Sequence, residues 1–232
     1  MCSSDLFVMD ALINKNLGYD PRRDFAAVTL ATSQSMVLVV HPAVPAKSVA
    51  ELIALAKAQP GKLSYGSGGS GTGTHLAGEL FARLAGINIV HVPYKGGSQS
   101  MVDLIAGQIN LIFQSLPTAA PHIKANRIRA LAVTTARRSV LLPELPTVAE
   151  SGLAGYEADN WYGIAVAART PPAIVQKLNA EIVAALNNAE VKQALLGQGL
   201  EPAPSSAEAF ASHMRADFGK WEKIVAELGL AH

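Results

Sequence analysis

The residues with the clearest potential for chemistry form a glycine-rich loop at residues 66–75. The loop consists of glycine, serine and threonine and ends at a histidine, His75. An apolar, strand-like segment containing Leu63 and Tyr65 precedes it, and a helical pattern starting near Leu76 follows. The first turn of a helix has unpaired N–H donors and the positive end of the helix dipole. A strand, loop and helix of this kind therefore indicate an anion site.

The loop lacks the residues that accompany a nucleotide site. A dinucleotide fingerprint needs an acidic residue about 20 positions further on, after the second strand. Here the second strand-like segment ends at Pro93-Tyr94-Lys95, and no Gly-Lys-Ser/Thr motif is present. Simple anion binding is therefore favoured over nucleotide binding. A flexible turn without a ligand is the simpler alternative, although so many glycines carry an entropic cost that an ordinary turn avoids.

Several polar residues near the loop have both a functional and a structural interpretation. His75 could donate a hydrogen bond to a ligand or act as a base, but packing against the loop is the favoured interpretation. Tyr94 and Gly96 follow one expected strand and Gln114 ends the next, at the strand ends where open α/β sheets bind ligands. Gln114 suits a polar small molecule, or it is only a polar cap at the end of a strand.

No catalytic set emerges from the sequence. Gly69-Ser70-Gly71 lacks the Gly-X-Ser-X-Gly frame of a nucleophile elbow, and no His-Glu-X-X-His motif suggests a metal. Cys2 is the only cysteine, which excludes an internal disulfide and a Cys-X-X-Cys redox pair. The residues leave an enzyme open but specify none, so we expect a protein without enzyme activity, cofactor or metal.

The composition is that of a globular chain with a large core. Of the 232 residues, 50% are hydrophobic and 16% are charged, and the formal net charge is +1. A nucleic-acid partner is not expected, because lysine and arginine form no stretch longer than a pair. No apolar run reaches the roughly 18 residues of a membrane span.

Strand-like and helical segments alternate along the chain, which predicts an α/β fold with parallel pairing and helices on both faces of the sheets. The proline- and glycine-rich segment 137–160 interrupts this pattern as a loop. Ser48 and Glu51 form a capping box that starts a helix ending at Pro60-Gly61. The expected strands are 25–31, 36–40, 63–65, 87–94, 109–113, 129–134 and 161–167, and the other expected helices are 75–86, 98–108, 116–126, 171–188, 190–197 and 207–228.

Several motifs in one order resemble the tripartite tricarboxylate transporter substrate-binding proteins, the Bug receptors. The resemblance extends from about Tyr19 to Leu228. The motifs that carry it are SGGSGTGTHLAGELF at 67–81, HVPYKG at 91–96, DLIAGQ at 103–108, RALAVT at 129–134, LPTVAESG at 145–152 and WYG at 161–163.

The resemblance implies a type II periplasmic-binding fold with two lobes that close on a small organic carboxylate and deliver it to membrane transporter subunits. Residues 36–159 would form a complete lobe, and residues 1–35 with 160–232 a partial one; a monomer is expected. Loop hydroxyls and backbone N–H groups would hold the ligand. Gln114 stands where many relatives carry Asp, so the ligand's identity does not transfer there. The candidate ligand-binding residues are Ser67, Gly69, Gly71, Thr72, His75, Tyr94, Gly96 and Gln114.

Members of this family begin with a signal peptide and a strand followed by a Pro-Phe-X-X-Gly-Gly type loop, which supplies the other side of the site. No such segment occurs here, so we expect the chain to lack the N-terminal part of a protein that is periplasmic at full length. Two alternatives stay open. One is a cytoplasmic enzyme that holds a phosphorylated small molecule at the glycine-rich loop, and the other is a non-functional fragment that shares only the fold.

Overall fold

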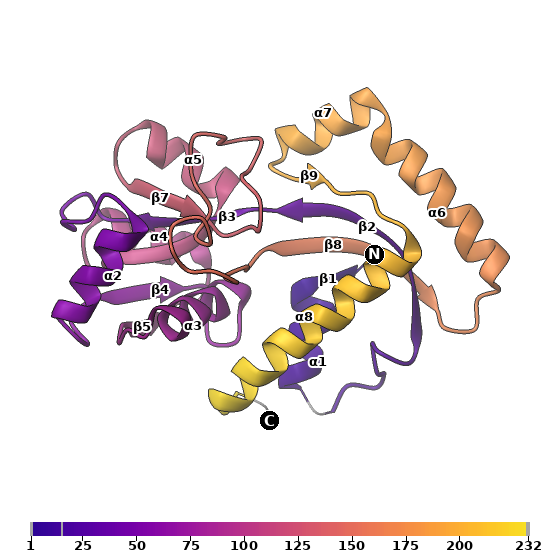
Figure 1. Cartoon of the computed structure of the whole chain (residues 1–232), viewed down its shortest axis with the longest axis horizontal. Coiled ribbons are helices and arrows are strands. Elements are labelled where there is room, and N and C mark those ends of the chain that lie inside the picture. The colour runs from indigo at the N-terminus through magenta and orange to yellow at the C-terminus, as the bar shows by residue number, and fades with distance from the viewer. Residues whose placement is uncertain (1, 15, 231–232) are drawn as a thin grey trace. The chain divides into compact units, whose positions relative to one another are not determined.

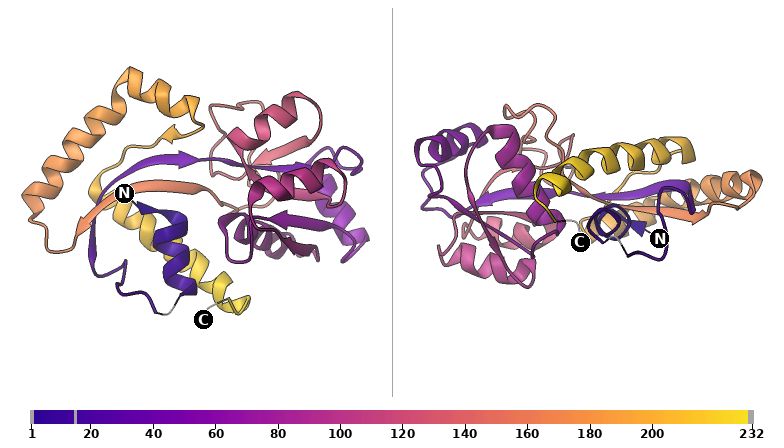
Figure 2. Two further views of the ribbon diagram at one scale, coloured as in Figure 1. Left: turned by 180° about the vertical axis from the view of Figure 1, so that it is seen from behind. Right: turned by 90° about the horizontal axis from the view of Figure 1, so that it is seen from below.

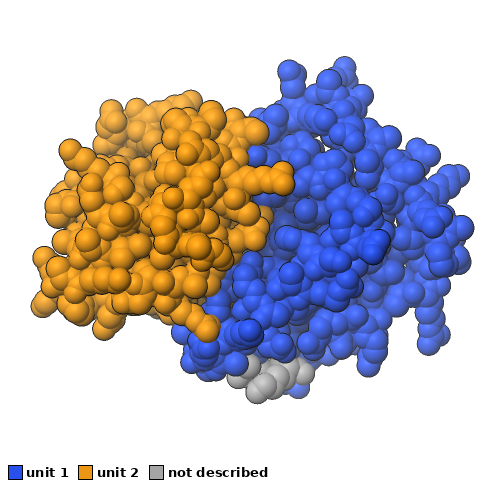
Figure 3. All heavy atoms as spheres, viewed as in Figure 1, with its two compact units in different colours: residues 1–34, 160–232 blue, residues 35–159 orange. Residues whose placement is uncertain are grey.

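The computed structural model of the chain describes residues 2–14 and 16–230. The chain divides into two compact units (Figures 1 and 3). Unit 1 comprises residues 1–34 and 160–232, and unit 2 comprises residues 35–159. The predicted partial lobe includes residues 1, 15 and 231–232, which lie outside the described residues. That one lobe is complete and the other partial stays a prediction.

Unit 2 contains a five-stranded sheet with the strand order β5-β4-β6-β3-β7. β4 pairs in parallel with both β5 and β6, so the C-terminal ends of these three strands lie at the same end of the sheet. β3 is buried along its whole length, as its continuous apolar run predicts. The strands are β3 (Met36–Val40), β4 (Ser64–Ser67), β5 (Val90–Pro93), β6 (Leu111–Ser115) and β7 (Arg129–Val133).

The α/β class is confirmed, but the sheets are mixed rather than mostly parallel. β3 runs antiparallel to both of its neighbours, β6 and β7. Alternation of strands and helices predicts one common direction for strands that a helix connects, and β4 to β7 do share one direction. β3 has the opposite direction because it follows β2 through Ser35 alone, without a crossover helix to set its direction.

The helices of unit 2 connect its strands, and their ends follow the sequence signals. Ser48 caps α2 by accepting a hydrogen bond from the Glu51 N–H at 3.2 Å, as the capping box predicts. Gly86 ends α3 in the left-handed conformation, with φ of +59°. The helices are α2 (Val49–Ala58), α3 (Gly73–Ala85), α4 (Gly97–Ile105) and α5 (Leu116–Lys124).

Unit 1 contains an antiparallel sheet with the strand order β1-β8-β2-β9. Helices α6 and α8 both pack against β2, and α8 also packs against η1 and α1 (Figure 2). The strands are β1 (Cys2–Ser3), β2 (Phe25–Gln34), β8 (Asn160–Ala167) and β9 (Glu201–Pro202). The helices are the π-helix η1 (Asp5–Met9), α1 (Asp10–Ile13), α6 (Pro172–Asn187), α7 (Ala189–Gly197) and α8 (Ala207–Glu227).

A buried carboxylate, Asp217, joins β8 to α8 in the core of unit 1. Its two oxygens accept hydrogen bonds from the indole N–H groups of Trp161 and Trp221, each at 2.9 Å. Lys220 lies 2.9 Å from the same carboxylate. Trp161 is fully buried and therefore belongs to the core, not to the wall of a cleft.

The sequence did not predict four short elements of unit 1. β1, η1 and α1 precede the first expected strand, and β9 lies between two expected helices. Each of these elements has five residues or fewer, so periodicity has too few positions to reveal it. Among the described residues, no helix is long and apolar enough to cross a membrane.

Candidate functional site

The glycine-rich loop connects β4 to α3, as the sequence predicts. Thr72 is the N-cap of α3, because its Oγ1 accepts a hydrogen bond from the His75 N–H at 3.4 Å. The same hydroxyl donates to the Gly69 carbonyl at 2.7 Å. Gly69 and Gly71 have φ angles of +132° and +80°, which favour glycine at both positions. The Thr72 hydroxyl thus shapes the loop.

Ser67, the last residue of β4, connects the loop to β5. Its Oγ accepts a hydrogen bond from the Gly69 N–H at 3.1 Å and lies 2.6 Å from Nε2 of His91. Only 1% of Ser67 is exposed. Its hydroxyl therefore faces the interior of unit 2 and fixes the start of the loop.

Two histidines stack against each other beside the loop. The ring centroids of His75 and His91 lie 3.9 Å apart, and Tyr65 stacks on His91 at 4.9 Å. Nδ1 of His75 accepts a hydrogen bond from the Gly71 N–H at 3.0 Å. Burial lowers the pKa of His75, and burial together with the neighbouring His75 lowers the pKa of His91 to about 4. Both imidazoles are therefore neutral near pH 7.

Glu79 completes this group of side chains from the second turn of α3. Its Oε1 accepts a hydrogen bond from the Tyr65 hydroxyl at 2.5 Å and lies 3.7 Å from Nε2 of His75. Burial and the hydrogen bond to Glu79 raise the pKa of Tyr65 well above its usual value. Side chains from α3, β4 and β5 thus pack together beside the loop.

Tyr94 and Gly96 follow the C-terminal end of β5 and lie next to the loop. The Tyr94 N–H donates to the Ser67 carbonyl at 3.1 Å, while its hydroxyl donates to Oδ2 of Asp103 at 2.7 Å. Burial, with the Asp103 carboxylate, raises the pKa of Tyr94 to about 12. Tyr94 therefore contributes its backbone to this end of the sheet. Gly96 is the N-cap of α4, and it supplies no side-chain cap to that helix.

Gln114 connects the end of β6 to the first turn of α4. Its side-chain amide donates to the Gly97 carbonyl at 2.9 Å, and its Oε1 accepts from the Ser115 N–H at 2.9 Å. Gln114 is buried. These contacts agree with the alternative of a polar cap at the end of the strand, and a ligand contact for Gln114 stays a prediction.

Gly68 lies where the N-termini of α3 and α4 approach each other. Its N–H donates to Oγ1 of Thr74 at 2.9 Å. A Cβ added at Gly68 would lie 3.5 Å from the Gly97 nitrogen and 3.6 Å from Oγ1 of Thr74. Within the part of the chain that the structure describes, the N–H groups of Gly97 and Ser98 have no hydrogen-bond partner. We call Gly68, Thr74, Gly97 and Ser98 the glycine cradle.

All eight predicted residues lie at the C-terminal ends of β4, β5 and β6 or at the starts of α3 and α4. Tyr65, Glu79 and His91 were not among the candidate residues predicted from the sequence. Two signals could have found them. Parallel pairing places His91 opposite Tyr65, and Glu79 follows His75 at the i, i+4 spacing that brings two helical side chains together.

This arrangement can donate hydrogen bonds to an anion, and it also places a hydroxyl next to an imidazole. The contact between Ser67 and His91 resembles a nucleophile and its base, which in a triad needs a third group to orient the imidazole. No such carboxylate bonds to His91 among residues 2–14 and 16–230. Over the same residues, no group of three or more acidic, cysteine or histidine side chains could hold a metal ion.

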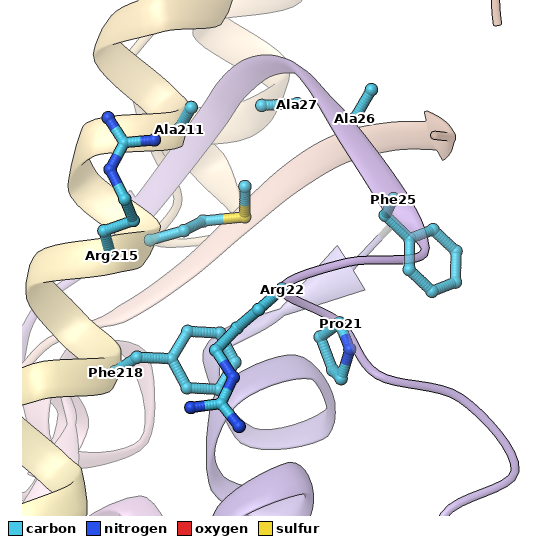
Figure 4. A pocket seen from close by; sticks show the side chains of 9 residues that line it. Pro21, Arg22, Phe25, Ala26, Ala27, Ala211, Arg215 and Phe218 are labelled. Carbon is cyan, nitrogen blue, oxygen red and sulfur yellow. The ribbon is translucent and has the colours of Figure 1, made fainter. Parts of the chain in front are cut away.

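A pocket of about 220 Å³ lies in unit 1, whereas the residues described above belong to unit 2 (Figure 4). Arg22 at its edge lies over the Phe218 ring, 5.4 Å from the centroid, and is within 3.7 Å of Glu222. Arg215 donates to the Ser212 hydroxyl at 2.9 Å. Both arginines thus interact with the chain's own groups. The pocket is lined by Pro21, Arg22, Phe25, Ala26, Ala27, Ala211, Met214, Arg215 and Phe218.

The class of protein, a receptor of a solute transporter, follows from the comparison with known families. The model of the tripartite tricarboxylate transporter family receptor matches residues 2–230. The chain belongs to this family, which confirms the resemblance seen in the motifs.

Individual relatives agree with this assignment. The chain is 36% identical over 231 residues to a protein of the tcbD–tcbE intergenic region of Pseudomonas sp. strain P51, covering 99% of this chain and 69% of that one. It is 30% identical to the protein BugT of Bordetella pertussis, covering 92% of this chain and 66% of that one. The structure of R. palustris Rpa4515 with adipate matches with a TM-score of 0.80 and 36% identity, covering 99% of this chain and 77% of that one.

The chain thus spans about two thirds of the length of these curated relatives. The family is one of periplasmic receptors, which confirms the prediction of a binding protein rather than an enzyme. The alternative of an enzyme acting on a phosphorylated substrate finds no support among the relatives.

Proposed function

We propose that this chain is the part of a periplasmic receptor that binds a small organic carboxylate at the glycine cradle. The observation that carries the proposal is the pair of N–H groups at Gly97 and Ser98, which have no partner within the described chain. The Gly97 nitrogen lies 3.5 Å from the position that a Cβ at Gly68 would take. A carboxylate needs about two such donors on one side, and a helix N-terminus supplies them with a favourable dipole. The adipate bound by the R. palustris relative supports this ligand class.

The character of the donors favours a carboxylate over a phosphate. The cradle offers neutral N–H and hydroxyl groups, and His75 and His91 are neutral near pH 7. A doubly charged phosphate is usually matched by arginine or lysine, whereas a singly charged carboxylate group can be satisfied by backbone donors. The cradle therefore suits ligands in which each charged group carries one negative charge.

We further propose that the full-length protein works as a monomer in the periplasm and delivers its ligand to the membrane subunits of a tripartite transporter. The family description names the transporter. The near-neutral net charge of +1 agrees with a small-molecule ligand and gives no support to a nucleic-acid partner. Size-exclusion chromatography with light scattering tests the monomer directly.

A thermal-shift panel of dicarboxylates, tricarboxylates, aromatic acids and sugar phosphates tests the proposed ligand class. A carboxylate at about 100 times its Kd should stabilise the chain by roughly 3 kcal/mol. Stabilisation by sugar phosphates alone would contradict the proposal. No response to any compound would favour the alternative of a fragment that shares only the fold.

The variant Gly68→Ala tests the position of the site. Its Cβ would fill the space in front of the Gly97 nitrogen without a severe clash, so we expect about tenfold weaker carboxylate binding and an unchanged fold. Gly219→Ala is the matched control, because a Cβ at Gly219 meets nothing within 4 Å and Gly219 lies in α8 of unit 1. Equal affinity of the two variants, measured by calorimetry, would place the site elsewhere.

A further inference from the structure

We infer that His75 is a positioning residue whose unprotonated Nδ1 holds the glycine-rich loop in its binding conformation. The inference rests on the proposed function, because the loop it positions carries the cradle. Nδ1 of His75 accepts the Gly71 N–H at 3.0 Å. A ring nitrogen that accepts from a backbone N–H must carry a lone pair, so this contact fixes His75 as the neutral tautomer with its proton on Nε2.

The contact anchors the part of the loop whose backbone conformation favours glycine. Gly71 has a φ of +80°, in the middle of the turn that leads from Gly69 to the N-cap residue Thr72. Gly71 follows Gly69 by two residues and precedes Thr72, which bonds back to the Gly69 carbonyl. The His75 contact therefore ties the top of the loop to the first turn of α3, whose N-terminus includes Thr74 of the cradle.

Protonation of His75 would reverse this contact. The imidazolium carries a proton on Nδ1, so two N–H groups would face each other and the Gly71 N–H would lose its acceptor. The groups that face the His75 ring are Tyr65 from β4, His91 from β5 and Glu79 from α3. Burial lowers the pKa of His75, and the positive end of the α3 dipole also disfavours the imidazolium.

Two substitutions of His75 distinguish the loss of the hydrogen-bond acceptor for Gly71 from the loss of a group that takes up a proton. The Oδ1 of asparagine lies as many bonds from Cα as Nδ1 of histidine, so His75→Asn keeps an acceptor for Gly71 that does not titrate. In His75→Gln the acceptor lies one bond further from Cα, near the position of Nε2. This variant should therefore lose the hydrogen bond from Gly71, and it is the counterpart of His75→Asn. His91→Gln removes the neighbouring histidine and leaves His75 in place.

The experiment follows the Gly71 amide signal of the ligand-free chain by ¹⁵N NMR from about pH 7 to about pH 4. In the native chain the signal should move with a midpoint below about pH 6.5. It should stay constant in His75→Asn, and His75→Gln should already be displaced at neutral pH. A Gly71 signal that does not move in the native chain, or that titrates unchanged in His75→Asn, would overturn the inference.

His91→Gln keeps the test decisive if His75→Asn fails to fold. The Gly71 titration should persist in His91→Gln, and its disappearance there would assign the effect to His91 and overturn the inference. Adipate binding at neutral pH is measured separately: it should weaken by about tenfold in His75→Gln and by less than about twofold in His75→Asn. Absence of adipate binding in the native chain and in every variant would count against adipate as the carboxylate bound at the glycine cradle, while the Gly71 signal would still decide the role of His75.

Discussion

His91 lies 2.6 Å from the Ser67 hydroxyl and 3.9 Å, centroid to centroid, from His75. A positive charge on His91 would be poorly hydrated because of burial, and the neighbouring His75 disfavours it further. The pKa of His91 therefore falls to about 4. Two of the residues that the sequence singles out as ligand-binding, Ser67 and His75, thus use their side chains to hold the loop. At this scale, the donors left for a ligand are the backbone N–H and hydroxyl groups of the glycine cradle.

The lowered pKa of His91 predicts a loss of stability in acid. In the unfolded chain an ordinary imidazole takes up a proton below about pH 6.5, whereas folded His91 does so only near pH 4. The unfolded state therefore binds more protons in this window, and the free energy of unfolding falls as the pH is lowered through it. Because His91 is partly exposed, solvent screening reduces the effect, and we expect it to account for a loss of about 1–2 kcal/mol at about pH 4.5.

Urea denaturation of the native chain and of His91→Gln at neutral pH and at about pH 4.5 measures this loss. The difference in unfolding free energy between the two pH values should be smaller in the variant. Equal pH dependence in the two proteins would show that His91 titrates normally and is not constrained as described.

At the scale of elements, two helical glycines have opposite surroundings. Gly78 in α3 packs on Tyr65 so closely that an added Cβ would lie 2.2 Å from its ring. Gly219 in α8 is exposed, and an added Cβ meets nothing within 4 Å. The first glycine allows α3 to approach β4 behind the loop, whereas the second only weakens its helix.

These surroundings predict opposite effects of the same substitution. Gly219→Ala should raise the free energy of unfolding by about 0.5–1 kcal/mol, because alanine is the better helix former. Gly78→Ala should lower it by about 2 kcal/mol or more, because Tyr65 and α3 must separate. Denaturation midpoints measure both effects. A neutral Gly78→Ala would mean that Tyr65 is not packed as described.

At the scale of the molecule, every residue of the glycine cradle and its supports lies in unit 2. Local signals predicted much of this unit. The capping box at Ser48 gave the start of α2, and the glycine-rich loop gave the junction of β4 and α3. These signals act over a few neighbouring residues, so a single sequence is enough to reveal them.

The remaining features depend on contacts between residues that are distant in the sequence. β3 pairs antiparallel with β6 and β7, which lie more than 70 residues away in the sequence. The contacts of Ser67 with His91 and of Trp161 with Asp217 likewise join separate elements. Residue type and spacing do not encode such pairings, so the sequence left the roles of Ser67 and Gln114 open.

The amide signals of Gly97 and Ser98 during a titration with adipate test the central claim most directly. If the cradle holds the carboxylate, both N–H groups gain an acceptor, and both signals should move downfield and saturate with one common Kd. Gly68→Ala should weaken that Kd by about tenfold. Binding of adipate without movement of the Gly97 and Ser98 signals would contradict the account.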